Sequence, residues 1–359
     1  MTRGIAFFSG PRPLDYGART ARLRWRRAAG ADLVVEWSAE SPASPALAGA
    51  ELWVLVREPG ALSGGLVPEP PPGGVLGSSR AALPPVHTLR ELESAPLAPS
   101  GDGSAPAAIA FRTSDHAPRE RETVEMLFQR LASLAAPAED FLALAFEDPS
   151  ERERPELTRR LPGGALRVLD AGCGAGGGIA LGRVRNRGWT VTGVEQDPLL
   201  AARARRNCDR VLEGDLADVL PRLEAAGERF DALVFADVLE HLDDPVAALA
   251  AGRRLAAPRA TLLVSVPNVG HLSIARDLLA GRFDPVPAGL CDAGHLRWFT
   301  RPFLEGALAE SGWTGARVES APGYPPPDPE AFLALASAWP DAERDSLLTY
   351  QWIATARAE

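Results

Sequence analysis

A glycine-rich turn and two acidic side chains follow one another along the middle of the chain. The turn lies in residues 170–176, whose sequence is DAGCGAG. Glycine at such a turn lets the backbone come close to a ligand, because no Cβ stands in the way. Glu195 ends the next apolar run and could accept hydrogen bonds from both hydroxyls of a ribose, while Asp215 could accept one from an adenine amino group. Together these residues predict a nucleoside pocket.

Polar side chains that could move a proton come later in the chain. Asp237 and His241 lie just past the apolar run that begins at Phe230, and His295 follows after a further long segment. Histidine titrates near neutrality and suits proton removal. We therefore predict catalytic roles for His241, His295 and Asp237, with His241 as the first choice of base and His295 as the second.

Structural roles compete with these chemical ones. Glu240 and His241 could instead cap the helix that follows them, and His295 could hold its own loop. For His271, which follows the fifth predicted strand, the structural role is the favoured interpretation.

Alternating strands and helices must position both groups of residues. Five short apolar strands are predicted at 166–170, 189–195, 210–213, 230–236 and 261–266. A helix is expected after each of the first four, and the first of these helices should reach about residue 187. Such alternation indicates a parallel, doubly wound sheet that binds ligands at the carboxyl ends of its strands.

The combined run resembles the class I S-adenosylmethionine-dependent methyltransferases over about residues 160–357. The resemblance is carried by the Asp-x-Gly-x-Gly-x-Gly loop, Glu195, Asp215 and the segment FDALVFADVLEHL at 230–242. It implies an α/β fold with a doubly wound, mostly parallel seven-stranded sheet, the Rossmann-like methyltransferase fold. Residues 313–319 and 347–356 are the candidates for the last two strands.

The resemblance also implies S-adenosylmethionine as the cofactor. Asp170 would position the methionine amino group, Glu195 would bind the ribose, and Asp215 with Leu216 would frame the adenine. The cofactor-binding residues expected on this basis are Asp170, Gly172, Cys173, Gly174, Gly176, Glu195, Gln196, Asp215, Leu216 and Ala236.

An NAD-binding Rossmann protein is the alternative for this half of the chain. Gly172, Gly174 and Gly177 also satisfy the Gly-x-Gly-x-x-Gly spacing of dinucleotide sites. The run through Asp215 and residues 237–242 is what favours the methyltransferase interpretation.

Three segments indicate the class of methyl acceptor. Residues 239–242, 266–268 and 295–300 look like the corresponding segments of ubiquinone-biosynthesis-like O-methyltransferases. Relatives often carry threonine before the last of these, where this chain has Gly294. The resemblance implies methyl transfer to a small-molecule acceptor, at an oxygen nucleophile in a biosynthetic pathway. The alternatives are a metal-assisted RNA 2′-O-methyltransferase and a non-catalytic, cofactor-binding partner subunit.

A metal site is the further alternative on the acceptor side. Asp237, Glu240 and His241, with His271 or His295, resemble the Glu-x-x-Glu-His plus His arrangement of small-RNA 2′-O-methyltransferases, where Mg²⁺ would orient the hydroxyl. Aspartate replaces the first glutamate, and the acidic chain lacks an RNA-binding platform. No metal is therefore expected.

Composition divides the chain into three parts. Residues 1–110 are expected to be an α/β or irregular region ending in a Pro/Gly-rich linker from about 63, with strands at 33–35 and 52–56. Residues 111–160 should form a helical cap on the next domain, with helices through 118–147, and residues 161–359 should be the cofactor-binding domain. The first region would bind substrate or form a homodimer. Its arginine cluster at 19–27 could hold a phosphate or an acidic partner, or be a solvated helix face.

Two loops in the last part lie where they could reach the pocket. Residues 268–300 are expected to be a long insertion that lines or covers it, or else a packing flap. The proline-rich stretch at 322–327 would reach over the site or serve as a rigid connector.

Charge and cysteine content limit the partners and the compartment. The formal net charge of the 359 residues is −9, which argues against a nucleic-acid partner. The three cysteines are too few and too scattered for a disulfide framework, which favours a cytoplasmic setting. No signal peptide, membrane span or membrane partner is expected, because no apolar run is long enough.

Overall fold

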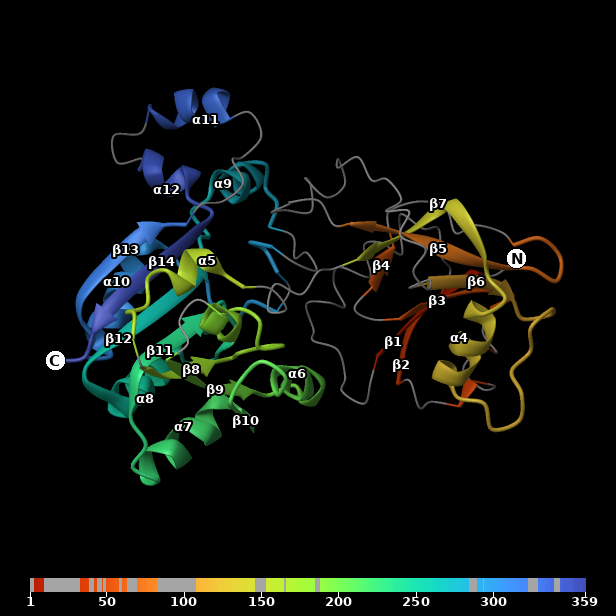
Figure 1. Ribbon diagram of the computed structural model, residues 1–359. Helices are drawn as coiled ribbons and strands as arrows, with labels where there is room; N and C mark the ends of the chain where they lie inside the picture. The colour runs from red at the N-terminus through yellow and green to blue at the C-terminus, as the bar shows by residue number, and fades with distance from the viewer. Residues whose placement is uncertain are drawn as a thin grey trace. The chain divides into compact units, whose positions relative to one another are not determined.

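The computed structural model describes most of the chain. The described residues are 3–9, 33–38, 42–43, 47, 50–57, 60–62, 70–82, 108–145, 153–164, 166–184, 188–283, 289–292, 294–321, 329–338 and 343–359. The predicted arginine cluster at 19–27 and the proline-rich stretch at 322–327 lie outside the described residues. The chain divides into two compact units, Met1–Glu147 with Phe283–Gly294 and Asp148–Arg282 with His295–Glu359 (Figure 1).

The second unit is built on a seven-stranded sheet with the strand order β10-β9-β8-β11-β12-β14-β13. Its strands are β8 (Leu166–Ala171), β9 (Trp189–Glu195), β10 (Arg210–Glu213), β11 (Phe230–Ala236), β12 (Ala256–Pro267), β13 (Thr314–Ser320) and β14 (Gln351–Arg357). The strands β8 to β12 run parallel, and β14 is antiparallel to both of its neighbours. The predicted doubly wound, mostly parallel seven-stranded sheet is confirmed.

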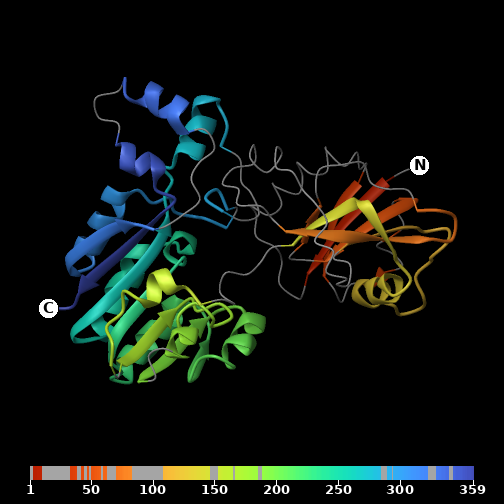
Figure 2. The same ribbon diagram turned by 45° about the horizontal axis from the view of Figure 1, so that its top comes forward.

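Helices connect these strands on both sides of the sheet, as Figure 2 shows. They are α5 (Pro155–Thr158), the 3-10 helix η3 (Ala180–Val184), α6 (Pro198–Ala204), α7 (Leu216–Ala225), the 3-10 turn η4 (Leu239–His241), α8 (Pro245–Leu255), α9 (Leu272–Leu279), α10 (Arg301–Glu310), α11 (Pro329–Ala336) and α12 (Arg344–Leu348).

Side-chain alternation along the strands divides the core into two apolar layers. On β11, Leu233 and Phe235 pack with residues of α7, α8 and α10, whereas Ala232 and Val234 pack on the other face with residues of α5 and α6. This follows from the two-residue period of a strand, which sends successive side chains to opposite faces. Both faces of the central strands are therefore buried, as the nearly continuous apolar runs predict.

Three local predictions in this unit are wrong. The helix expected to reach residue 187 is the short 3-10 helix η3, and its glycine-rich start, Gly176–Gly178, disfavours an α-helix. The segment 268–300 is not one long loop, because it contains the amphipathic helix α9. The last strand begins at Gln351, since residues 344–348 form α12.

The first unit also contains a seven-stranded sheet, with the order β2-β1-β3-β6-β5-β7-β4. Its elements are β1 (Arg3–Ser9), β2 (Leu33–Ser38), β3 (Leu52–Arg57), β4 (Gly60–Leu62), β5 (Val75–Ala82), β6 (Ala108–Arg112), α4 (Val124–Ala132) and β7 (Ala136–Ala145). The strands expected at 33–35 and 52–56 are confirmed as parts of β2 and β3.

Two predictions for the first unit are wrong. The segment after Pro137 forms the strand β7, which pairs with β5, where a helix was expected. The linker expected from residue 63 contains the strand β5. Sheet pairing contributed by distant strands overrides the local preference in both places.

The helix α4 packs in the first unit, which differs from the predicted cap on the cofactor-binding domain. Leu127 and Phe128 are buried in one cluster with Trp53 and Phe111. Leu134 lies beyond the end of the helix and is 60% exposed.

No helix in the described part of the chain combines the length and apolar composition needed to cross a bilayer.

The packing of β11 leads to a stability prediction. Phe235 is fully buried, so Phe235→Ala should lower the free energy of unfolding by about 3–5 kcal/mol through lost burial and a residual cavity. The matched control is Phe303→Ala on α10, where the ring is 44% exposed and the loss should stay below about 1 kcal/mol. Urea unfolding followed by tryptophan fluorescence measures both, and equal losses would contradict this account of the core.

Candidate functional site

The turn after β8 is held in one conformation by backbone contacts. Gly172 has φ +71°, and a Cβ on this residue would lie 2.5 Å from Cγ2 of Val238. The amides of Gly172 and Cys173 both donate to the carbonyl of Val194 on β9, at 2.9 and 3.0 Å. Glycine is required at position 172 for two reasons: the positive backbone angle, and the close approach of Val238 in the loop after β11.

Glu195 fastens this turn to the end of β9. One carboxylate oxygen accepts the amide of Gly174 at 2.9 Å, and the other accepts the amide of Asp197 at 2.8 Å. The side chain is buried, with 8% exposed. Each oxygen keeps a second acceptor position, so Glu195 can still accept the two hydroxyls of a ribose.

A cavity of about 820 Å³ opens at the carboxyl ends of β8, β9 and β11. Nearly all of the predicted cofactor-binding residues line it: Asp170, Gly172, Cys173, Gly174, Glu195, Gln196, Asp215, Leu216 and Ala236. The structure thus brings together residues that lie up to 66 positions apart in the sequence.

Gly176 is the predicted cofactor residue that does not line the cavity. A Cβ there would lie 3.0 Å from the Cα of Ala204, the last residue of α6. The glycine therefore allows the turn to pack closely against α6, which is a structural role.

Asp215 has two functions in this arrangement. It is the N-cap of α7, where its Oδ1 accepts the amide of Ala217 at 2.7 Å, and it also lines the cavity. The cap holds the carboxylate in place at the cavity wall.

Asp170 is a buried carboxyl group inside the cavity, with 3% exposed. Burial and the nearby charge of Glu195 raise its pKa to about 7, while the positive charge of Arg154 acts in the opposite direction. A cationic ligand group placed beside Asp170 would favour its ionised form.

Arg154 is a cavity residue that the sequence analysis did not find. Its guanidinium is 17% exposed and is paired with the carboxylates of Glu156 and Asp237. Burial acts to lower the pKa of Arg154, but these two carboxylates raise it above its usual value. The only sequence signal is a single arginine before Pro155 in an arginine-rich stretch, which by itself indicates nothing about a cavity.

Asp237 directs its carboxylate toward Arg154. Its Oδ2 accepts a hydrogen bond from the guanidinium of Arg154. Its Oδ1 accepts hydrogen bonds from the hydroxyl of Ser265, at 2.9 Å, and from the side-chain amide of Gln351. Asp237 lines the cavity, but the structure gives it a set of contacts different from those of the two histidines with which it was predicted.

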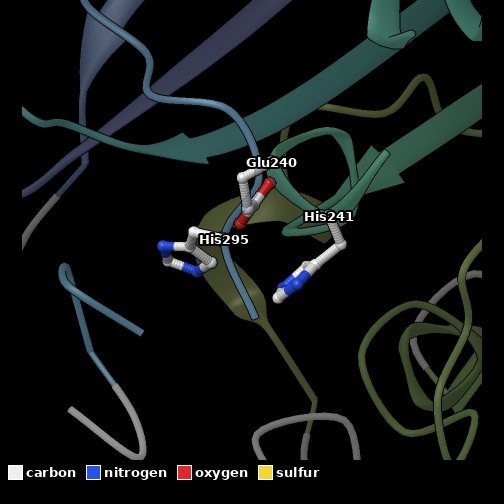
Figure 3. Close-up of side chains that lie close together, drawn as sticks. All are labelled: Glu240, His241 and His295. Atoms are coloured by element: carbon white, nitrogen blue, oxygen red, sulfur yellow. The ribbon is translucent and has the colours of Figure 1, made fainter. Parts of the chain in front are cut away.

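The side chains of His241 and His295 lie close to that of Glu240 (Figure 3). The two imidazole rings have centroids 4.9 Å apart, and His241 lines the cavity. The amides of Leu296 and Arg297 donate to the carbonyl of Glu240 at 2.7 and 3.0 Å, which ties the loop of His295 to η4. Of the side chains considered for a metal site, Asp237, Glu240 and His241 with His271 or His295, the structure brings together Glu240, His241 and His295.

The same three side chains are a metal-type donor set. One carboxylate oxygen and two imidazole nitrogens lie within 4.8 Å of one another. Such donors suit a divalent transition metal as well as proton transfer. Asp237 and His271 are not part of this group.

His271 caps a helix. It is fully buried and stands at the N-cap of α9, where its Nδ1 accepts the amide of Ser273 at 3.3 Å. The structural role favoured from the sequence is confirmed.

Comparison with known families identifies the class of protein. A family model described as a methyltransferase domain matches residues 121–318, which is more than half of the chain. The chain therefore belongs to this methyltransferase family. The class predicted from the glycine turn and the segment 230–242 is confirmed.

Curated relatives narrow the comparison. The ubiquinone biosynthesis O-methyltransferase of Cereibacter sphaeroides strain ATCC 17025 is 33% identical over 130 residues, covering 36% of this chain and 52% of that protein. The protein of the same name from Hahella chejuensis is 38% identical over 111 residues, covering 30% of this chain and 45% of that protein. The chain spans about half the length of the curated relatives it matches.

Solved structures that match part of this chain share little sequence with it. A SAM-dependent methyltransferase from Archaeoglobus fulgidus has a TM-score of 0.40 and 17% identity, covering 56% of this chain and 88% of that chain. Magnesium protoporphyrin IX methyltransferase from Synechocystis PCC 6803 with bound SAH has a TM-score of 0.37 and 20% identity, covering 56% and 77%.

The raised pKa of Asp170 predicts how stability depends on pH. Between pH about 4 and 7 the native carboxyl keeps its proton while the unfolded one ionises, so the native state binds more protons. The free energy of unfolding should therefore fall as pH rises through this window, by at most about 1.4 kcal/mol per pH unit from this group.

Asp170→Asn should remove that contribution, so the variant should gain stability relative to the wild type between pH 5 and 8. Urea titrations at both pH values measure the difference, with Glu310→Gln on the exposed end of α10 as the matched control. A constant difference between wild type and Asp170→Asn would show that Asp170 does not titrate in this window.

Proposed function

We propose that the protein transfers a methyl group from S-adenosylmethionine to an oxygen of a small-molecule acceptor in a biosynthetic pathway. The observation that carries the proposal is one cavity lined by the glycine turn, Glu195, Asp215 and His241. Membership of the methyltransferase family supports the reaction class. When bound, S-adenosylmethionine supplies an electrophilic methyl group on a positively charged sulfur.

Charged side chains at the β8 end of the cavity match the amino-acid part of this cofactor. Asp170 would accept hydrogen bonds from the ammonium group, and the guanidinium of Arg154 would bind the carboxylate. The two residues have opposite charges and line the same cavity, so a zwitterion meets a partner for each of its ends.

The nucleoside part would lie along β9 and α7. Glu195 retains acceptor positions for the ribose hydroxyls, and Asp215 with the buried Leu216 would frame the adenine. Gln196, Cys173 and Ala236 would complete this end of the pocket.

On the acceptor side, His241 would remove the proton from the attacking hydroxyl. Its ring reaches the cavity, and His295 lies close enough to orient it or to share the proton. In-line displacement needs the acceptor oxygen held against the methyl carbon, so alignment by the cavity wall contributes as much as the base.

The acceptor class rests on the relatives. Proteins named ubiquinone biosynthesis O-methyltransferase match 30–36% of this chain, which supports an oxygen nucleophile on a small molecule. We further propose a cytoplasmic location, in keeping with three free cysteines, and a role of the first unit in binding the acceptor or a second copy of the chain.

The cofactor assignment predicts a selective binding pattern. Calorimetric titration should show binding of S-adenosylmethionine and S-adenosylhomocysteine but not of NAD. Glu195→Ala should reduce the affinity for both sulfur nucleosides at least about 100-fold, because it removes two buried charge-assisted hydrogen bonds and releases the turn. Glu213→Ala, which affects a surface ion pair with Arg205, is the matched control and should bind normally. Binding of NAD alone would overturn the cofactor assignment.

The base assignment predicts a loss of rate without a loss of cofactor affinity. His241→Ala should lower kcat about 100-fold or more, the usual contribution of a general base, while the S-adenosylhomocysteine affinity stays unchanged. His116→Ala in the first unit is the control. A fully active variant would remove His241 as the base.

Two further measurements, activity in EDTA and binding to RNA, test the alternative functions. Loss of activity in EDTA, restored by a divalent ion, would assign Glu240, His241 and His295 to a metal-assisted reaction. Salt-dependent RNA binding would favour an RNA acceptor over a small molecule.

A further inference from the structure

Four polar side chains from distant parts of the sequence form a network at the floor of the cavity. Arg154 precedes α5, Asp237 follows β11, Ser265 lies near the end of β12, and Gln351 begins β14. Because β14 is antiparallel to β12, its first residue reaches the same sheet edge as the ends of the parallel strands, with Gln351 opposite Pro267.

Arg154 is held at three points of its guanidinium. Nε donates to Glu156, one Nη donates to Asp237, and the other donates to the side-chain carbonyl of Gln351 at 3.1 Å. A guanidinium has five N–H groups, so these contacts leave one on each Nη for a ligand. Two N–H groups on neighbouring nitrogens form the fork that binds a carboxylate with both of its oxygens.

Asp237 accepts hydrogen bonds through both of its carboxylate oxygens. Its Oδ2 accepts from the guanidinium of Arg154, and its Oδ1 accepts from two donors, the hydroxyl of Ser265 and the side-chain amide of Gln351. Its backbone has φ +54°, a conformation that non-glycine residues seldom adopt, and its amide donates to the carbonyl of Ser265 at 3.0 Å. The surrounding structure therefore keeps the carboxylate pointed at Arg154.

The charges in the cavity explain why this arrangement matters. Arg154 and Arg254 are the two basic residues among those lining it, whereas Asp170, Glu195, Asp215, Asp237, Asp243 and Asp244 also line it. Asp170 is close enough for its pKa to be lowered by the charge of Arg154, so it is a competing partner for an unrestrained guanidinium. Pairing with Asp237 and Gln351 keeps Arg154 at one place.

We propose that Asp237 is a positioning residue that acts through Arg154: together with Ser265 and Gln351 it orients the guanidinium for the carboxylate of the cofactor's amino-acid end. This inference rests on the proposed function, since it assumes a ligand with that carboxylate. It replaces the catalytic role predicted for Asp237 from the sequence.

The decisive experiment compares two ligands that differ only at the end in question. S-adenosylhomocysteine carries the amino-acid carboxylate and ammonium, whereas 5′-methylthioadenosine has the same nucleoside and sulfur without them. For Asp237→Asn, calorimetry should show about tenfold weaker binding of S-adenosylhomocysteine, as for one charge-assisted contact, and less than about a twofold change for 5′-methylthioadenosine. In steady state, KM for S-adenosylmethionine should rise and kcat at saturation should be retained.

A double-mutant cycle shows whether Asp237 acts through Arg154. Arg154→Gln should itself weaken S-adenosylhomocysteine binding, and adding Asp237→Asn to it should cause no further loss. The matched control is Glu319→Gln, which affects the more exposed ion pair between Arg160 and Glu319 and should bind both ligands normally. Ser265→Ala, which leaves both charges in place, provides a second variant of the network with a smaller loss expected in the same direction.

The outcomes separate this inference from the proposed function. Equal loss of both ligands in Asp237→Asn, or additive effects in the cycle, would overturn the positioning role. Normal affinity with a collapse of kcat would return Asp237 to the role of a base. If the wild type bound neither ligand, the cofactor assignment itself would fail.

Discussion

The structure of the site depends on how Glu195 holds the glycine turn. Its two carboxylate oxygens accept the amides of Gly174 and Asp197, so one buried side chain joins the end of β9 to the turn after β8. The turn can come so close because Gly172 has no Cβ where Val238 packs. Since Val238 belongs to the segment that leads into η4, the same contact relates the cofactor end of the cavity to the end that carries His241.

Oppositely charged side chains lie close together around Asp170, although acidic residues outnumber arginines among those that line the cavity. A buried carboxyl such as Asp170 is costly to ionise, and its pKa is raised to about 7 by burial and by Glu195. Arg154 acts against that rise and is in turn paired with Glu156 and Asp237. A zwitterionic ligand with an ammonium at Asp170 and a carboxylate at Arg154 would fit this pattern, because each of its charges would meet a side chain of opposite charge.

Main-chain hydrogen bonds anchor the loop of His295 to η4. The carbonyl of Glu240 accepts two amides from the loop that carries His295, so the two imidazoles meet through backbone geometry, with ring centroids 4.9 Å apart. The side chains of Glu240, His241 and His295 also lie together, with one ligand-type atom of each within 4.8 Å of the others. The carboxylate of the neighbouring Asp237 instead accepts hydrogen bonds from the side chains of Arg154, Ser265 and Gln351.

Local signals in the sequence, namely apolar runs, a glycine turn and acids at strand ends, predicted the sheet of the second unit and several residues that line its cavity. The turn, Glu195 and Asp215 could be found in this way, and all three line the cavity. Local sequence signals could not predict that residues 136–145 form the strand β7, because that strand pairs with β5, which lies more than 50 residues earlier. Nor could they find Arg154, which joins the site only because β11, β12 and the antiparallel β14 bring Asp237, Ser265 and Gln351 to one edge. A strand can be predicted from neighbouring residues in the sequence, whereas the partners of a buried charged side chain depend on which distant segments the fold brings next to it.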